Sequence, residues 1–236
     1  MASSEMKQLL VLAGGFGKRL RSVVSSVPKP LAPVNGEPFL KHLMINWQKQ
    51  GIREMTLLLH YEAEKIVEIA QELQSSASLK GTKVTCITES TPLGTGGALL
   101  NAVQILDLKE SFLVANADTW LESSILPMAR SHPCSIGTVE VPDASRYGEV
   151  VLREGYVSEF KEKTGFSNPG RINAGIYHLH PEIFMEVEKQ KSFSLETDLF
   201  PNLVATSCLR GVELRGYFMD IGIPSDYFQF CESLNV

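Results

Sequence analysis

A glycine-rich, cationic segment follows an apolar run near the amino terminus, in the stretch LLVLAGGFGKRL from Leu9 to Leu20. Glycines let the backbone approach a ligand closely and point its N–H groups at anionic oxygens. Arg19 adds a planar guanidinium suited to bidentate binding of phosphate. Lys29, which stands between two prolines, adds a compact positive charge. The residue types indicate a phosphate site. The alternative is a structural turn that carries surface cations.

The spacing excludes two common nucleotide-binding motifs. A Rossmann fingerprint that started at Gly15 would need its third glycine where Leu20 stands. A Walker A loop would need a glycine five residues before the Gly17-Lys18 pair, and Leu12 occupies that position. The expected place of the phosphate site is beyond the carboxyl end of the first strand, where open α/β sheets bind ligands.

Two further segments have residue types suited to ligand binding. Asp118 directly follows a buried apolar run, and a carboxylate there could bind Mg²⁺ through one oxygen, leaving the other positions to water and phosphate. A helix N-cap is the alternative role of this residue. The stretch ESTPLGTGGAL, residues 89–99, places a second glycine loop at a helix start. Helix N-termini favour acceptors and anions, although a plain turn before a helix has similar glycines.

Apolar patterning predicts the elements that position these residues. In the first half, buried strands alternate with helices, which is typical of βαβ units and a mostly parallel sheet. The helix that Pro38 opens and Gly51 closes has an apolar stripe of Phe39, Leu40, Leu43, Met44 and Trp47. The predicted strands cover residues 7–13, 54–60, 83–89 and 111–118, and the predicted helices cover residues 38–51, 62–73 and 97–106.

The pattern changes after His132, where strand-like segments dominate. Residues 148–163 favour a hairpin that turns at Glu154-Gly155. The other expected strands are residues 134–141 and 172–180, with helices at 194–204 and 225–234. We therefore expect an α/β fold, a Rossmann-like three-layer α/β/α arrangement with a mostly parallel mixed central sheet. The chain is expected to form one domain, residues 1–236, with a nucleotide-binding half at about 1–130 and a more mixed half at about 131–236.

Composition narrows the function classes. The 236 residues carry a net charge of -5, which disfavours a polynucleotide partner but leaves a small anion in a local cationic pocket open. No apolar run is long enough to predict a membrane span. The four cysteines have no paired spacing, which is typical of reduced thiols in a cytoplasmic protein. The five histidines are dispersed, and His178 and His180 have no evident third ligand for zinc.

The segment LAGGFGKRL followed by VPKPLAPVNGEPFL resembles the signature of the sugar-1-phosphate nucleotidyltransferases, G-G-x-G-T-R-L and then P-K-P. The resemblance extends over nearly the whole chain. In length and in PLGTGGAL it is most similar to the D-glycero-D-manno-heptose 1-phosphate guanylyltransferases. Two positions depart from the family pattern: Lys18 replaces a threonine, and Ala117 replaces the glycine of Asn-Gly-Asp. The resemblance implies the nucleotide-diphospho-sugar transferase fold and a reaction of an NTP with a sugar 1-phosphate that gives an NDP-sugar and pyrophosphate.

The resemblance also implies roles for individual residues. The catalytic cations would be Arg19, Lys29 and Lys163. Asp118, with Asp220 as partner ligand, would hold Mg²⁺. The nucleotide would contact Leu12, Ala13, Gly14, Gly15, Gly17 and Lys18, with Glu89, Gly94 and Thr95 around the nucleobase and ribose. The sugar, bound by the second half of the chain, would contact Tyr147, Gly148, Glu162, Asn173 and Gly175.

Specificity rests on the resemblance alone. GTP and D-glycero-α-D-manno-heptose 1-phosphate are the expected substrates, and surface polysaccharide biosynthesis is the expected purpose. A cytidylyl-, uridylyl- or thymidylyltransferase acting on another sugar 1-phosphate stays open. A non-catalytic nucleotide-sugar sensor would be expected to lack a metal-binding acid or a phosphate-binding cation, and none is missing here. Asn116-Ala-Asp118 faintly resembles the Asp-x-Asp of metal-dependent glycosyltransferases, but the amino-terminal phosphate loop argues against that class. A homodimer stays open as well.

Overall fold

The structure is a computed structural model that describes residues 8–122, 125–163, 165–187 and 192–234. It divides into two compact units. The first contains Met1–Pro92, Ala115–Glu122 and Met219–Val236, and the second contains Leu93–Val114 and Ser123–Phe218. The organisation of the chain as a single domain with two substrate-binding halves stays a prediction.

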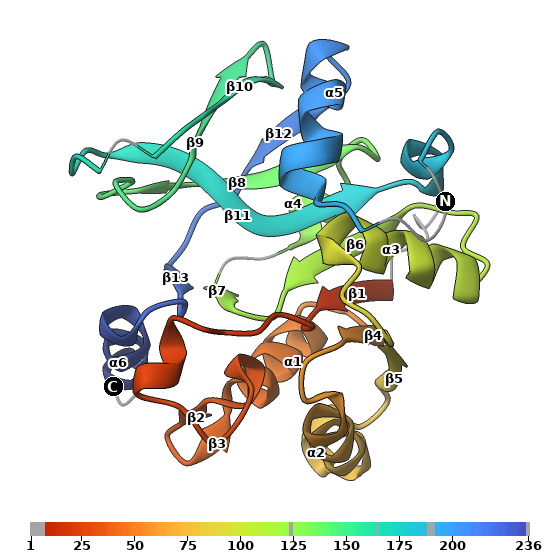
Figure 1. Ribbon diagram of the computed structural model, residues 1–236, viewed down its shortest axis with the longest axis vertical. Coiled ribbons are helices and arrows are strands. Elements are labelled where there is room, and N and C mark those ends of the chain that lie inside the picture. Colours follow the sequence, from red (N-terminus) through yellow and green to blue (C-terminus); the bar gives the residue numbers. More distant parts are fainter. Residues whose placement is uncertain (1–7, 123–124, 164, 188–191, 235–236) are drawn as a thin grey trace. The chain divides into compact units, whose positions relative to one another are not determined.

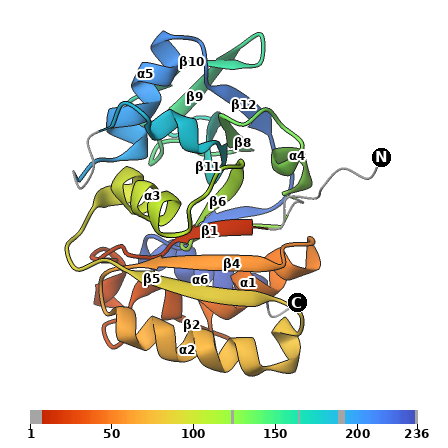
Figure 2. The same ribbon diagram turned by 90° about the vertical axis from the view of Figure 1, so that its right-hand side faces the viewer.

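The first unit is built around three parallel strands in the order β5-β4-β1. They are β1 (Gln8–Leu12), β4 (Glu54–Leu59) and β5 (Lys83–Thr88), linked by helices α1 (Phe39–Lys49) and α2 (Ala63–Ser75). Figure 2 shows α2 running alongside β5. Because the strands are parallel, their carboxyl ends meet at one edge, where open α/β sheets place ligands.

Helix α1 shows how the sequence forms these elements. Pro38 precedes the first turn, and the five residues of the predicted apolar stripe are the five buried residues of the helix. Each of them is at most 3% exposed. The helix therefore buries one face in the core of the first unit, as its period predicts.

Short elements complete the first unit. They are the 3₁₀ turns η1 (Leu20–Ser22), η2 (Lys29–Leu31) and η3 (Ala77–Leu79), the strands β2 (Pro33–Val34), β3 (Glu37–Pro38), β7 (Thr119–Leu121) and β13 (Phe218–Asp220), and helix α6 (Pro224–Ser233). Strand β13 begins on the last residue of the second unit, and its other two residues belong to the first. Of these pieces, only the final helix was predicted.

The second unit has strands in the order β11-β8-β12-β10-β9. In Figure 1, the long β11 lies beside β8, its antiparallel partner. The strands are β8 (Ser135–Val141), β9 (Glu149–Arg153), β10 (Tyr156–Lys161), β11 (Gly170–Leu179) and β12 (Arg210–Glu213). The helical elements are α3 (Gly94–Ile105), α4 (Leu126–Ala129), η4 (Pro181–Phe184), the π turn η5 (Leu195–Leu199) and α5 (Phe200–Ala205). Strand β6 (Phe112–Asn116) leads the chain from the second unit into the first.

The predicted hairpin at residues 148–163 is confirmed. Strands β9 and β10 pair antiparallel, and the turn residues Glu154 and Gly155 both have positive φ, 52° and 81°. A two-residue turn of this kind matches the twist of the flanking strands. The α/β fold with a mixed sheet is confirmed too: β1, β4 and β5 pair parallel, while the second unit combines antiparallel pairs with the parallel pair β8–β12.

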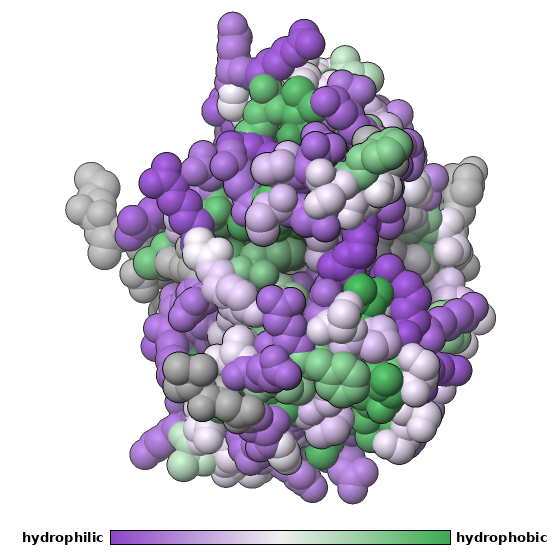
Figure 3. Space-filling view, turned by 90° about the vertical axis from the view of Figure 1, so that its left-hand side faces the viewer, coloured by the Kyte–Doolittle hydropathy of each residue, from purple (hydrophilic) through white to green (hydrophobic). Residues whose placement is uncertain are grey.

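The surface patches, the helix lengths and the cysteines agree with what the composition predicts. On the face drawn in Figure 3, hydrophobic side chains form separate patches among hydrophilic ones. Within the described ranges, no helix has both the length and the apolar character needed to cross a membrane. All four cysteines are free thiols.

Candidate active site

The glycine loop begins where β1 ends and needs glycine at two positions for different reasons. Gly14 passes so close to His60 that a Cβ would lie 3.2 Å from the His60 backbone nitrogen. Gly17 has a φ of +57°, and a Cβ there would lie 2.9 Å from the Cβ of Lys29. Since that φ disfavours other residues and the space is already filled, glycine at position 17 lets the Lys29 stem pass the loop.

The backbone of Lys29 is held by its neighbours. Pro28 precedes the 3₁₀ turn η2 in an extended conformation, Lys29 is the first residue of the turn, and Pro30 is the second. Proline fixes φ on both sides, so the direction in which the lysine side chain leaves the backbone is set before any ligand binds.

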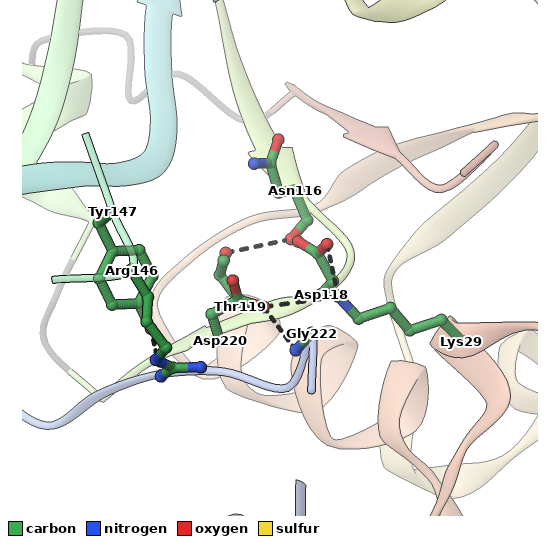
Figure 4. A network of polar contacts seen from close by, with 8 residues as sticks. All are labelled: Lys29, Asn116, Asp118, Thr119, Arg146, Tyr147, Asp220 and Gly222. Atoms are coloured by element: carbon green, nitrogen blue, oxygen red, sulfur yellow. Dashed lines mark hydrogen bonds and ion pairs between the residues drawn. The ribbon is translucent and has the colours of Figure 1, made fainter. Parts of the chain in front are cut away.

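The side chain of Lys29 ends between two carboxylates. Its Nζ lies 2.7 Å from Oδ2 of Asp118 and 3.4 Å from Oδ1 of Asp220. Figure 4 shows the lysine reaching this cluster, with the Gly222 N–H donating to Asp220 over 2.7 Å. The Lys29 side chain is only 9% exposed, so its charge is screened little by solvent.

Backbone hydrogen bonds bring the two acids together. The Ala117 N–H donates to the carbonyl of Leu12, the last residue of β1, over 3.0 Å. The Ile221 N–H donates to the Asp118 carbonyl over 3.0 Å. The turn after β6 and the turn after β13 are thereby fixed beside the end of β1, although Lys29 and Asp220 are 191 residues apart in the chain.

The surroundings of Asp220 disfavour its negative charge. Burial raises the pKa of this carboxyl above its ordinary value, and the nearby charge of Asp118 raises the pKa further. Lys29 and the Gly222 N–H act in the opposite direction. Two carboxylates so close need a positive charge between them, which Lys29 supplies in this structure.

A cleft of about 220 Å³ opens over this cluster. That volume is below the roughly 300–1,000 Å³ of a pocket for a whole ligand, so it suits part of a nucleotide. Eight residues expected at the substrates line it, namely Leu12, Ala13, Gly15, Gly17, Lys18, Arg19, Lys29 and Asp118. Pro30, Ala117 and Gly222 complete the lining.

Two cations of the cleft are exposed. The Nζ of Lys18 lies 5.6 Å from the centre of the Phe16 ring. The Arg19 guanidinium has no hydrogen-bond or ion-pair partner within the described part of the chain. An exposed guanidinium beside a glycine loop can bind phosphate oxygens without breaking an existing ion pair.

Glu89 belongs to the same edge of the first unit. It directly follows β5, its N–H donates to the Leu59 carbonyl over 2.8 Å, and its own carbonyl lies 3.2 Å from Nδ1 of His60. The backbone at Glu89 is thus fixed against the end of β4. Its expected role at the nucleobase or ribose stays a prediction.

The start of α3 differs from the simple anion site that its glycines suggest. The N–H groups of Gly96 and Gly97 donate to the Phe193 carbonyl over 3.0 and 3.3 Å. The hydroxyl of Thr95 donates to Glu196 over 2.8 Å. These donors are therefore occupied by the chain itself, and the argument from a free helix N-terminus does not hold for them. Gly94 is exposed, with a φ of +73°.

The sugar-side residues of β11 are held by local hydrogen bonds. The Gly175 N–H donates to Oδ1 of Asn173 over 2.9 Å, and Gly175 has a φ of +69°. The Asn173 amide donates to the Tyr177 hydroxyl over 3.1 Å. The irregular pairing of β11 with β8 between Asn173 and Tyr177 lies at the same place, so the bulge and these bonds shape one feature.

The other residues expected at the sugar lie just before β9 and just after β10. Gly148 lies where a Cβ would come within 3.1 Å of the Lys161 carbonyl oxygen, and the Tyr147 ring lies 6.3 Å from the Phe218 ring. Glu162 and Lys163 directly follow β10 and are exposed. Neither forms a hydrogen bond or ion pair with another residue in the ranges the structure describes.

Sequence reasoning missed two residues that the structure brings to these sites. Gly222 donates to Asp220 and lines the cleft, and the MDIG motif around Asp220 was the signal available for it. Glu196 contacts Thr95 from a position 101 residues away. Its neighbour Ser194 was recognisable as a helix-start residue, but nothing in the sequence predicts that partner.

The family model described as nucleotidyl transferase matches residues 8–235. The chain belongs to this family. It is 37% identical over 229 residues to D-glycero-alpha-D-manno-heptose 1-phosphate guanylyltransferase from Campylobacter jejuni, covering 94% of this chain and 98% of that relative.

Two further matches show how far the family likeness extends. Mannose-1-phosphate guanylyltransferase 1 from Arabidopsis thaliana is 35% identical over 227 residues, which are 92% of this chain and 62% of that longer relative. The crystal structure of HddC from Yersinia pseudotuberculosis complexed with GMP-PN matches with a TM-score of 0.84 and 35% identity, over 97% of this chain and 100% of that one. The family that the glycine loop resembles and the α/β fold class that the alternating strands and helices predict are therefore confirmed.

Proposed function

We propose that this nucleotidyl transferase joins GTP to D-glycero-α-D-manno-heptose 1-phosphate and releases pyrophosphate. The observation that carries the proposal is the Lys29 ammonium set between Asp118 and Asp220, in a cleft where the Arg19 guanidinium has no partner among the described residues. The names of the Campylobacter and Arabidopsis relatives support guanine as the base. Those names also support a manno-configured sugar, and the heptose is our choice because that relative matches along 98% of its own length.

The chemistry needs no general base. The nucleophile is a phosphate oxygen of the sugar 1-phosphate, whose second pKa of about 6 leaves it mostly ionised at neutral pH. This oxygen forms a bond to the α-phosphorus of GTP, and the bond from that phosphorus to the oxygen bridging to the β-phosphate breaks. The electron pair leaves with pyrophosphate. The work left to the protein is to bring two anions together and to stabilise the leaving charge.

Cations of the chain take the three phosphate positions. Arg19, exposed at the cleft, would bind the β- and γ-phosphates, and Lys29 would bind the α-phosphate as charge develops there. Lys163 would hold the phosphate of the incoming sugar. Lys18, which replaces the usual threonine, adds a further positive charge next to the triphosphate and reduces the repulsion between the two substrates.

Asp118 and Asp220 fit a divalent cation such as Mg²⁺. Carboxylate oxygens are ligands that Mg²⁺ prefers, and the pair already holds a positive charge in this structure. Within the described residues, no group of three or more His, Cys, Asp or Glu side chains is placed to hold a metal ion. Water and substrate phosphates would complete the ligand set. A bound Mg²⁺ would supply charge neutralisation at the phosphate oxygens.

The remaining contacts divide by substrate. The nucleotide would lie against Leu12, Ala13, Gly14, Gly15 and Gly17, with Glu89, Gly94 and Thr95 around base and ribose. The sugar would lie against Tyr147, Gly148, Glu162, Asn173 and Gly175, where the glycines leave room for the ring and the acid and amide bind hydroxyls.

The product would serve surface polysaccharide biosynthesis. A cytoplasmic location and a homodimer belong to the same proposal.

A pyrophosphate-release assay tests this function. The four NTPs are paired in turn with heptose, mannose, glucose and N-acetylglucosamine 1-phosphates. The expected result is release with GTP and the manno-configured sugars, and at least tenfold less with the other bases. Release with another NTP would make the chain a cytidylyl-, uridylyl- or thymidylyltransferase. Calorimetric binding of GTP and sugar phosphate without any release would favour a non-catalytic sensor.

A further inference from the structure

A chain of hydrogen bonds in the second unit joins two residues that are expected at different substrates. Thr95 is expected at the nucleotide and Asn173 at the sugar, and Glu196 lies between them. One oxygen of the Glu196 carboxylate accepts from the Thr95 hydroxyl over 2.8 Å. Its other oxygen accepts from the Tyr177 hydroxyl over 3.1 Å, and Tyr177 in turn accepts from the Asn173 amide over 3.1 Å.

The hydrogen positions in this network follow from the bonds around it. The Thr95 hydroxyl oxygen already accepts from the Leu195 N–H over 2.9 Å, so its hydrogen is directed at Glu196. Ser194 repeats the pattern, because its hydroxyl accepts from the Glu196 N–H and donates to the carboxylate over 2.8 Å. A carboxylate only accepts, and three hydroxyl hydrogens converge on it. The network is therefore satisfied only with two acceptor oxygens at position 196.

Close packing fixes the backbone beside the network. The Phe193 carbonyl accepts from the N–H groups of Gly96 and Gly97, and the Phe193 N–H donates to the Leu93 carbonyl over 3.0 Å. A Cβ at Gly94 would collide with the Phe193 carbonyl oxygen. The glycine loop at the start of α3 thus takes its shape from the segment that carries Glu196.

The far end of the network is buried. Tyr177 is 1% exposed, and its ring lies 5.3 Å from that of Phe200. Its hydroxyl is held between the carboxylate and the Asn173 amide, whose oxygen accepts from the Gly175 N–H. The amide oxygen and amide nitrogen of Asn173 and the hydroxyl of Tyr177 are all held by these bonds. A change at Glu196 therefore has a direct route to the bulge of β11 at Asn173.

We propose that Glu196 is a positioning residue that sets the Gly94–Thr95 loop and Asn173 at the same time, and so couples the binding of the nucleotide to that of the sugar 1-phosphate. The proposal rests on the function proposed above, since it uses the expected substrates of Thr95 and Asn173. Glu196 itself contacts no substrate. Loss of its acceptor oxygens moves both binding surfaces, whereas loss of Tyr177's hydroxyl moves only the sugar surface.

The test compares the steady-state kinetics of E196Q and Y177F with those of the parent, using GTP and the best sugar 1-phosphate of the assay above. The E196Q variant keeps the size of the side chain and replaces one acceptor oxygen by a donor. We expect its KM to rise roughly tenfold for both substrates, the order of a lost hydrogen bond to a charged group. For Y177F we expect the rise for the sugar 1-phosphate alone.

A matched control lies two residues along the same turn. The Asp198 carboxylate accepts from the Ser194 N–H over 2.7 Å and is outside the route from Thr95 to Asn173. The D198N variant makes the same acid-to-amide change, and we expect both of its KM values to stay within twofold of the parent. Thermal melting of all variants separates a general loss of stability, which reduces the active fraction, from the expected changes in KM.

The double variant sharpens the result. Because both changes break one chain of bonds, E196Q with Y177F should raise the KM for the sugar 1-phosphate no more than E196Q alone. Folded E196Q with both KM values within twofold of the parent would overturn the proposal, and a rise for GTP alone would overturn the coupling. If E196Q does not fold, Y177F decides, and an unchanged sugar KM contradicts the proposal.

A failure of the proposed function can be told apart from a failure of the positioning role of Glu196. If the parent releases no pyrophosphate with any pair, that function fails, and calorimetric titration of GTP into parent, E196Q and D198N then tests the nucleotide end. Weaker GTP binding by E196Q alone keeps the positioning role of Glu196. Equal binding by all three ends it.

Discussion

The first unit and the second unit each place a lysine beside acidic residues, but in opposite surroundings. Lys29 is 9% exposed, and its Nζ lies between the carboxylates of Asp118 and Asp220, whose backbone segments are held by hydrogen bonds. Lys163, beside Glu162 at the end of β10, is exposed and has no ion pair among the described residues. The comparison indicates two kinds of site: charges that are positioned before the substrate arrives, and charges that the substrate itself must order.

This difference predicts which substitutions lower the rate of catalysis and which lower the affinity for substrate. A preorganised charge in a partly buried site stabilises developing charge without rearrangement, so its removal lowers kcat. An exposed, mobile cation mainly holds the substrate, and its removal raises KM. The variants below test that division, from the largest expected effect to the smallest.

K29A has the largest expected effect. It removes the cation that we propose for the α-phosphate and leaves Asp118 and Asp220 without the positive charge between them. We expect kcat for pyrophosphate release to fall about 10²–10³-fold, as for other preorganised groups at developing charge. D118N should lose activity to a similar extent. The measurement is turnover of folded protein at saturating GTP and sugar 1-phosphate.

The control for K29A is K65A, which removes an exposed lysine that is also in an ion pair, 2.9 Å from Glu62. Its turnover should stay within twofold of the parent. Activity within tenfold of the parent for both K29A and D118N would contradict the assignment of the cleft.

G17A tests whether the loop positions Lys29. The added methyl group meets the Lys29 Cβ at 2.9 Å, in a backbone conformation with φ +57° that costs roughly 1–2 kcal/mol for a residue with a side chain. We expect a lower melting temperature and about a tenfold loss of kcat. G15A is the stability control, because a Cβ there meets nothing within 4 Å. Equal melting temperatures for the two variants would refute the close-packing argument.

K163A should have a smaller effect, confined to the sugar 1-phosphate. We expect a roughly tenfold rise in the KM for that substrate, with the KM for GTP and the melting temperature unchanged. Because an exposed charge is screened by salt, added salt should weaken sugar 1-phosphate binding more in the parent than in K163A. Steady-state kinetics at low and high ionic strength measure both effects. A rise in the KM for GTP would contradict the assignment of Lys163 to the sugar 1-phosphate.

D220N has the smallest expected effect, on stability in metal-free buffer. Burial and the charge of Asp118 raise the pKa of Asp220 in the folded protein above its ordinary value of 3.8. The folded state is therefore destabilised at pH values above the raised pKa, where Asp220 is ionised, and this cost disappears below pH 3.8. D220N should melt a few degrees higher than the parent at pH 7, and the gap should shrink as the pH falls. A lower melting temperature at pH 7 would contradict this reading.

The sequence predicted local features well where period and turn chemistry decide them. The buried residues of α1, the hairpin at Glu154-Gly155 and the glycine loop at the end of β1 all follow from short-range rules. Each depends on side chains that are neighbours along the chain. The resemblance in the glycine loop supplied the family, which the comparisons confirm.

Contacts between distant segments could not be predicted from the residues alone. Nothing local predicts that Lys29 meets Asp220, or that the Phe193 carbonyl occupies the donors at the start of α3. A helix N-terminus binds whatever acceptor packs on it, and at Gly96 and Gly97 the acceptor comes from the same chain.

The most direct test of the account is a crystal structure of the protein with GTP and Mn²⁺, without sugar 1-phosphate. The anomalous signal of Mn²⁺ locates the metal independently of any expectation. We predict Mn²⁺ on Asp118 and Asp220, the triphosphate against Arg19, and the Lys29 ammonium moved from the carboxylates to the α-phosphate. A metal bound elsewhere, or Lys29 still between both carboxylates beside a bound triphosphate, would contradict the account.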